Sequence, residues 1–274
     1  MNNFIQRTLT GLLFVVVLIA SITLSSISFF CLFLVILILS LKEFYDLSKK
    51  TGAQPHYLIG ILAGAYIFIA SYLTAKGLIS PLVQLGIIPA FTLIFILELF
   101  RNKENPFNNI AYTILGLIYI ALPISLFNFI IFPYSPKSDA FYPGLLLGLF
   151  ILQWANDTGA YLSGSMLGKH RLFERISPKK SWEGSIGGAI ITLGIGYIIS
   201  LFIPQVSMIH WLVIGLIVVV AGTFGDLVES LLKRSIQVKD SGNILPGHGG
   251  MLDRFDSIFL AAPVVFVYLR LVLA

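Results

Sequence analysis

The sequence predicts an all-α, polytopic integral membrane protein with about nine transmembrane helices. Hydrophobic residues make up 57% of the 274 residues, charged residues make up only 11%, and the mean hydropathy is +0.92. A soluble domain carries roughly 25% charged residues, because its surface must be hydrated. The apolar residues also gather into runs close to the roughly 20 residues that a helix needs to cross a bilayer. Helices are required there, since lipid offers no hydrogen-bond partners to bare backbone groups.

Nine apolar runs are candidate spans. Their approximate limits are 8–25, 27–42, 57–75, 81–100, 110–133, 142–165, 184–204, 209–228 and 255–273. The first two are the shortest, and we interpret them as a retained transmembrane hairpin, because no small-residue cleavage site leads into a polar chain. Without an internal repeat or low-complexity linker, residues 1–274 are expected to form one membrane domain. Its N-terminal part would be 1–135, and its C-terminal part, 140–274, would carry the catalytic motifs.

The basic residues predict the orientation of these spans. With the N-terminus inside, 15 of the 18 lysines and arginines fall on the cytoplasmic side, which leaves Lys76, Lys137 and Arg270 outside. This asymmetry follows the positive-inside rule. Topology therefore explains the net charge of +5, and we expect no nucleic-acid partner. The compact chain favours a bacterial inner (plasma) membrane over an organelle, and the single Cys31 excludes an internal disulfide.

Two acidic pairs stand at the ends of the last two runs. Asp226 and Glu229 close the eighth run, and Asp253 and Asp256 open the ninth with the same i, i+3 spacing, which places each pair on one helix face. Because one loop joins the two runs, both pairs are expected at the same cytoplasmic surface. Clustered carboxylate oxygens are typical Mg²⁺ ligands. The alternative is structural: helix dipoles and neighbouring basic side chains would stabilise the acids.

The segment 230–256 between these pairs is basic and rich in glycine. Its basic side chains are Lys233, Arg234 and Lys239, and its glycines Gly247, Gly249 and Gly250 flank His248. Glycines leave backbone N–H groups accessible to phosphate oxygens, although the spacing of a Walker loop is absent. The alternative is a flexible turn whose lysines extend to the membrane interface.

Two upstream segments carry further polar residues. Asn156 and Asp157 interrupt the sixth run. In the functional interpretation they contact a nucleotide or a metal ion. In the alternative they form hydrogen bonds to neighbouring helices. Residues 177–181, Ser-Pro-Lys-Lys-Ser, lead into the seventh run, with Ser181 as a candidate N-cap. Helix N-termini favour anions, so these lysines are candidate phosphate ligands. They are equally explained as a positive-inside flank beside the interfacial Trp182.

The 27-residue segment from Ser230 to Asp256 resembles the signature of the phosphatidate cytidylyltransferases, also called CDP-diacylglycerol synthases, without departure at a fixed position. The matching residues are Ser230, Lys233-Arg234, Lys239-Asp240, His248-Gly249-Gly250 and Asp253-Arg254-Phe255-Asp256. Residues 154–170 and 176–188 also resemble segments of this family, so the resemblance covers roughly 150–257. The N-terminal third shares only its hydrophobic spans.

The resemblance implies an enzyme that transfers CMP from CTP to phosphatidate, giving CDP-diacylglycerol and pyrophosphate with Mg²⁺ as cofactor. It implies a catalytic set of Asp226, Asp253, Asp256, Lys239 and Asp240, of which the first three would hold the metal, with Asp240 or Asp157 as an alternative additional ligand. The substrate-binding residues that it implies are Asn156, Asp157, Ser177, Lys179, Lys180, Ser181, Lys233, Arg234, His248, Gly249, Gly250 and Arg254. A homodimer embedded in membrane lipid is expected, and a second cation, acyl-chain preference and the role of the N-terminal third stay open.

Two other functions fit some of these features. A polyprenyl-phosphate sugar-phosphate transferase would also place aspartates near Mg²⁺ at the membrane edge, but it would use a UDP-sugar. A transporter would use intramembrane acids for protons or cations, yet such folds often show inverted repeats and binding sites near the midplane. The acids here cluster toward one edge of the spans. The D-G-x-x-A-R pattern of CDP-alcohol phosphotransferases is absent from the sequence.

Overall fold

The computed structural model describes residues 3–132, 141–245, 247 and 249–272. His248, one of the predicted phosphate contacts, lies outside the described residues. The chain separates into two compact units, which we describe one at a time. The first unit comprises Met1–Phe141 and Ile236–Phe255, and the second comprises Tyr142–Ser235 and Asp256–Ala274.

The described residues confirm the predicted all-α polytopic membrane fold, and each of the nine apolar runs coincides with a helical segment. Within this part of the chain, seven helical segments are long and apolar enough to cross a membrane. They are Ser26–Lys49, Tyr57–Ala75, Pro81–Arg101, Pro106–Ile131, Trp182–Phe202, Met208–Ser235 and Leu252–Val272. The apolar helix Thr8–Leu24 is shorter. The 25-residue helix α7 (Pro143–Leu167) is long enough, but Gln153, Asn156 and Asp157 lower its hydropathy.

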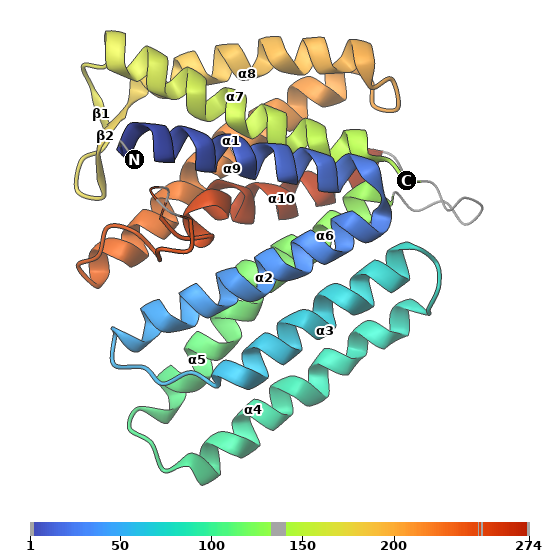
Figure 1. Ribbon diagram of the computed structural model, residues 1–274, viewed down its shortest axis with the longest axis vertical. Helices are drawn as coiled ribbons and strands as arrows, with labels where there is room; N and C mark the ends of the chain where they lie inside the picture. Colours follow the sequence, from blue (N-terminus) through green and yellow to red (C-terminus); the bar gives the residue numbers. More distant parts are fainter. Residues whose placement is uncertain (1–2, 133–140, 246, 248, 273–274) are drawn as a thin grey trace. The chain divides into compact units, whose positions relative to one another are not determined.

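The first unit is a bundle of helices around an aromatic core. Its helices are α1 (Asn3–Leu24), α2 (Ser26–Lys49), α3 (Tyr57–Ala75), the 3₁₀-helix η1 (Pro81–Gly86), α4 (Ile87–Arg101), α5 (Pro106–Gly116), the π-helical turn η2 (Leu117–Ala121) and α6 (Leu122–Ile131). Helix α3 packs against both α2 and α6 (Figure 1). Phe33 of α2 lies edge-on to Phe127 of α6, with 5.3 Å between ring centroids, and both side chains are fully buried. Such aromatic pairs contribute beyond the apolar area that they bury.

A buried polar cluster joins the ends of α3, α4 and α5 in this unit. The Glu98 carboxylate lies 2.7 Å from His56 Nε2 and 3.1 Å from Arg101 Nη1, and it accepts a 2.7 Å hydrogen bond from Asn109 Nδ2. Burial and the positive charge of Arg101 lower the pKa of His56, against the opposing effect of Glu98. A neutral imidazole is therefore favoured near neutral pH, and the Glu98 carboxylate contacts all three of these side chains.

Replacing Glu98 with Ala is expected to destabilise the protein by about 3 kcal/mol, because removing one member of a buried ionic cluster leaves its partners unsatisfied. The readout is the thermal unfolding midpoint of the purified protein in detergent. Glu104→Ala is the matched control, since Glu104 is an exposed carboxylate close by in the chain. Equal midpoints for the two variants would contradict the proposed importance of the cluster.

The second unit consists of α7 (Pro143–Leu167), β1 (Arg171–Phe173), β2 (Ser177–Ser181), α8 (Trp182–Phe202), α9 (Met208–Ser235) and the part of α10 (Leu252–Val272) that follows Phe255. Helix α7 packs along α8, and both contact α9 (Figure 1). The approach of α7 and α8 requires glycine, since a Cβ on Gly184 would lie 2.8 Å from the Ala160 carbonyl oxygen. Small residues at such contacts are typical of membrane helix packing.

A short antiparallel hairpin, β1–β2, carries the predicted phosphate-binding lysines to the start of α8. Its register pairs Arg171 with Ser181 and Phe173 with Ser177. Ser181 is the N-cap of α8, because its hydroxyl accepts a 3.1 Å hydrogen bond from the Gly184 backbone N–H. The predicted N-cap is therefore confirmed, and it places Lys179 and Lys180 immediately before a helix N-terminus.

Candidate functional site

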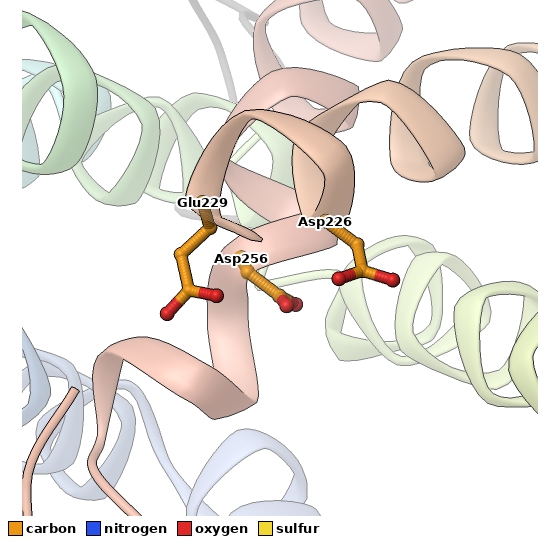
Figure 2. Close-up of side chains that lie close together, drawn as sticks. All are labelled: Asp226, Glu229 and Asp256. Carbon is orange, nitrogen blue, oxygen red and sulfur yellow. The ribbon is translucent and has the colours of Figure 1, made fainter. Parts of the chain in front are cut away.

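Three carboxylates converge in the second unit from two different helices. Asp226 and Glu229 lie on α9, Asp256 lies on α10, and each offers an oxygen within 4.8 Å of oxygens on the other two. Figure 2 shows the Asp256 carboxylate lying between those of Asp226 and Glu229. Glu229 is fully buried, whereas the two aspartates are partly accessible. The aspartates can therefore be reached from outside, while Glu229 closes the inner side of the cluster.

Glycine allows the two helices to come this close. A Cβ on Gly225 of α9 would lie 2.6 Å from the carbonyl oxygen of Asp256 and 2.9 Å from Ser257 Cα, so any side chain would force the helices apart. Asp226 follows Gly225 directly and is thus brought to Asp256 by the helix contact. The Asp256 carboxylate accepts a 2.6 Å hydrogen bond from the Ser257 backbone N–H. The local sequence Gly-Asp therefore places the carboxylates together.

Two lysines partly neutralise the carboxylate cluster. Lys180, at the end of β2, forms an ion pair with Asp226, and Lys233, one turn along α9, forms an ion pair with Glu229. Ser230 Oγ also donates a 3.2 Å hydrogen bond to Asp226 Oδ1. Three carboxylates and two ammonium groups thus lie close together among the described residues. Such clustered acids are a suitable set of hard oxygen ligands for a divalent cation.

A cavity of about 280 Å³ opens beside Asp226. Its lining residues are Asn156, Asp157, Ala160, Tyr161, Lys179, Lys180, Ser181, Gly184, Ser185, Gly222, Thr223, Asp226 and Ser257. Ligand pockets typically measure roughly 300–1,000 Å³, so this cavity is at the lower limit of that range. It joins the lysines of the β-hairpin and the polar pair of α7 to one carboxylate of the cluster. The predicted binding residues among the lining come from three separate segments of the chain: Asn156 and Asp157, residues 179–181, and Asp226.

Two amide oxygens near this cavity have no hydrogen-bond partner among the described residues. They are Oδ1 of Asn156 and Oε1 of Gln153, both on α7 and both buried. The nitrogen of Gln153, by contrast, donates a 2.9 Å hydrogen bond to Asp157 Oδ1. A buried acceptor without a donor is destabilising. The orphaned oxygen of Asn156 in the cavity wall is therefore consistent with a polar ligand or a cation there.

In the first unit, Asp253 organises the glycine-rich loop, by which we mean the described residues 236–245, 247 and 249–251. Its carboxylate accepts hydrogen bonds from the backbone N–H groups of Ser241, at 3.0 Å, and Gly250, at 2.8 Å. Gly249 has a φ of +82°, and a Cβ there would lie 2.5 Å from Asp253 Oδ2. The predicted metal-binding role of Asp253 stays a prediction. The contacts described for it are to loop backbone.

The remaining predicted residues fall into two groups. In the second unit, Ser177 lies in β2, Lys233 is buried in the last turn of α9, and Arg234 is exposed beside it. In the first unit, Lys239, Asp240 and Arg254 are exposed, whereas Gly250 is buried. The cluster also contains Glu229, the i, i+3 partner of Asp226, which is not among the metal ligands that the sequence predicts.

Comparison with known proteins gives a consistent result. The sequence profile of the cytidylyltransferase family matches residues 5–272. A phosphatidate cytidylyltransferase of Staphylococcus haemolyticus is 32% identical over 267 residues, which covers 96% of this chain and 98% of that protein. A protein of the same name from Bacillus subtilis is 33% identical over 271 residues, 97% of each chain. The similarity thus includes both units and the N-terminal third.

Proposed function

The chain belongs to the cytidylyltransferase family, and from that premise we propose that Asp226, Glu229 and Asp256 form the divalent-metal centre at which it works. The protein is a membrane-bound nucleotidyltransferase, a phosphatidate cytidylyltransferase that makes CDP-diacylglycerol. A sugar-phosphate transferase and a transporter are not retained. The observation that carries the proposed centre is the convergence of three carboxylates within 4.8 Å, beside a cavity lined by lysines.

The residues present fit Mg²⁺. The ion prefers oxygen ligands, usually keeps several waters, and is often held by one or two carboxylates together with substrate phosphates. The two accessible aspartates supply such carboxylates, and the cavity beside Asp226 is also lined by Asn156, whose buried Oδ1 has no hydrogen-bond partner among the described residues. When bound, Mg²⁺ would neutralise phosphate charge. Asp253 is retained as a further candidate ligand, and a second cation stays open.

We place the nucleotide in the cavity of the second unit. Lys179 and Lys180 provide positive charge, and Ser181, the N-cap, marks the start of a helix whose N-terminus favours anions. Asn156 and Asp157 line the wall formed by α7. These groups are suited to hold the phosphates and the polar parts of CTP.

The family resemblance assigns the glycine-rich loop and its flanks to phosphate binding. The exposed side chains of Arg234, Lys239 and Arg254 supply positive charge suited to that role. The residues concerned are Lys233, Arg234, Lys239, His248, Gly249, Gly250 and Arg254. Asp240 is assigned to the catalytic set on the same basis.

The reaction needs no protein nucleophile. A phosphate oxygen of phosphatidate forms a bond to the α-phosphorus of CTP, the bond from this phosphorus to the β-phosphate bridging oxygen breaks, and pyrophosphate leaves with that electron pair. Two polyanions must approach one another, so the protein contributes chiefly positioning and neutralisation of charge. Lys180 serves both purposes, because it faces the cavity and pairs with Asp226.

We further propose that the protein lies in a bacterial plasma membrane with this centre on the cytoplasmic side. The distribution of lysine and arginine supports that orientation. Cytosolic CTP and the headgroup of a membrane lipid would both reach a site at the ends of helices. A homodimer remains an expectation from family resemblance.

Lys180→Ala is expected to lower kcat/KM for CTP by about 10²-fold, the scale of removing one group that stabilises charge in the reaction. The measurement is the initial rate of pyrophosphate release at varied CTP with saturating phosphatidate. Lys50→Ala, at the exposed lysine that is the C-cap of α2, is the control and should leave the rate unchanged. A Lys180→Ala enzyme as active as this control would remove Lys180 from the proposed site.

The proposed function itself is tested with the purified protein in detergent. We expect pyrophosphate release that requires CTP, phosphatidate and Mg²⁺ together, with labelled CDP-diacylglycerol as product. A UDP-sugar with a polyprenyl phosphate should give no reaction. Turnover with the second substrate pair and none with the first would contradict the proposal.

A further inference from the structure

A buried carboxylate in the N-terminal third is not used by the mechanism above. Glu43 lies near the end of α2, and its residue is only 5% exposed. A charged group at such a position must be hydrogen-bonded or paired, because burial otherwise destabilises it strongly. The partners of Glu43 are found about 200 residues later in the chain.

Glu43 accepts hydrogen bonds from the glycine-rich loop with both of its oxygens. Oε1 accepts from the Met251 backbone N–H at 2.9 Å, and Oε2 accepts from the Leu252 N–H at 2.8 Å and from Ser241 Oγ at 3.1 Å. Leu252 is the first residue of α10. N–H groups at the start of a helix lack partners within the helix, and the helix dipole favours an anion there. The Glu43 carboxylate supplies both the acceptor and the charge.

The loop is shaped to receive this carboxylate. A Cβ on Gly242 would lie 2.5 Å from Glu43 Oε1, and a Cβ on Gly250 would lie 2.4 Å from Oε2. Loop backbone therefore closes on Glu43 from two sides, at positions where any side chain would displace it. Asp253 holds the same loop through the N–H groups of Ser241 and Gly250. Two carboxylates thus fix the loop, and Glu43 belongs to a helix from the other end of the sequence.

We infer that Glu43 is a positioning residue: it holds the glycine-rich loop and the first turn of α10 in the conformation that the cytidylyl transfer requires. The inference rests on the proposed function, which assigns Lys239, Asp240 and Asp253 of these segments to the reaction. It gives the N-terminal third a part in the chemistry, although that third contributes no residue to the proposed substrate contacts.

Glu43→Gln is the variant that tests this role, because it keeps the size of the side chain and removes one acceptor oxygen. Three groups donate hydrogen bonds to the Glu43 carboxylate. In the Gln variant the side-chain NH₂ would face at least one of these donors and could not accept its hydrogen bond. We expect faster hydrogen–deuterium exchange in peptides covering 241–252. We also expect a higher KM for CTP and a kcat/KM lower by about 10- to 100-fold, since small displacements of positioning groups have effects of that size.

The rise in KM separates positioning from a merely structural role. A variant that only folds less completely would lower the active fraction, and therefore kcat, without changing KM. Asp46→Asn is the matched control: Asp46 lies one turn along α2, its side chain is 48% exposed, and it pairs with Lys49 at 2.8 Å. This control should alter neither exchange nor kinetics. Exchange in the hairpin 171–181 should be unchanged in both variants.

Each result decides the inference. Faster loop exchange together with a higher KM in Glu43→Gln, and neither in Asp46→Asn, supports it. Exchange in 241–252 at the wild-type rate, or a loosened loop with unchanged KM and kcat, overturns it.

Should Glu43→Gln not fold, Ser241→Ala is the second variant, because it removes a single donor to Glu43. It should show smaller changes in the same direction, and unchanged exchange in that variant overturns the inference. If the unaltered protein does not turn over CTP with phosphatidate, the proposed function fails, whereas the exchange measurements still decide whether Glu43 holds the loop.

Discussion

Asp256→Asn is expected to lower Mg²⁺-dependent pyrophosphate release from CTP and phosphatidate by on the order of 10³-fold. Losing a carboxylate from the cluster weakens the binding of the cation and therefore its neutralisation of phosphate charge. Such neutralisation lowers the activation free energy by several kcal/mol. Each 1.4 kcal/mol, roughly, corresponds to a tenfold change in rate. The Asp256 carboxylate lies between those of Asp226 and Glu229, so its loss removes the middle member of the cluster (Figure 2). The measurement is the initial rate over a range of Mg²⁺ concentrations.

Asp226→Asn should produce a similar loss, and the double variant should be little worse than either single variant. Residues that act as one unit are strongly non-additive, because removing one member already disables the unit. Independent roles would instead give losses that multiply. An Asp256→Asn enzyme that keeps a large part of its activity at low Mg²⁺ would exclude Asp256 as a ligand.

Asp253→Asn is expected to nearly abolish turnover while the protein still inserts into the membrane. In the structure this carboxylate accepts backbone N–H groups from Ser241 and Gly250, and a Cβ on Gly249 would lie 2.5 Å from it. Asn offers one acceptor in place of two, so the loop loses part of its support. The activity loss is measured in the same pyrophosphate assay, with membrane insertion checked by recovery in the membrane fraction.

The dependence on Mg²⁺ distinguishes the two roles of Asp253. If Asp253 is a metal ligand, as the sequence predicts, the variant should need more Mg²⁺ for half-maximal rate. If it acts through the loop, extra Mg²⁺ should not restore the rate, and exchange in 241–252 should increase. Normal activity at ordinary Mg²⁺ would contradict both roles.

Much of the fold was predictable because the bilayer imposes a simple rule on the sequence. Every span must be a helix of similar length, so the nine apolar runs coincide with helical segments. The N-cap at Ser181 was also predictable, since its signal is local. The hairpin β1–β2 was not predicted: its strands have three and five residues, and its sequence of charged residues and Pro178 has no alternating apolar pattern.

The candidate site was predictable in its residue types more than in its contacts. Spacing indicated that Asp226 and Glu229 share a face of one helix and that Asp253 and Asp256 share a face of the next, and the resemblance supported Asp256 as a ligand. Only coordinates show that Gly225 lets α9 approach α10 closely enough to bring these groups together. Glu43 carried no signal at all, because an acidic residue at the end of an apolar run is ordinary. Its partners, Met251 and Leu252, are backbone donors that no side-chain pattern can reveal.

The location of a bound divalent ion tests the proposed centre most directly. Crystals grown with Mn²⁺ in place of Mg²⁺ would give an anomalous signal that identifies the ion without reference to activity. We predict a peak at coordinating distance from the carboxylates of Asp226 and Asp256, lost in the Asp256→Asn protein. An ordered Mn²⁺ bound elsewhere, with neither aspartate among its ligands, would contradict the metal centre proposed here.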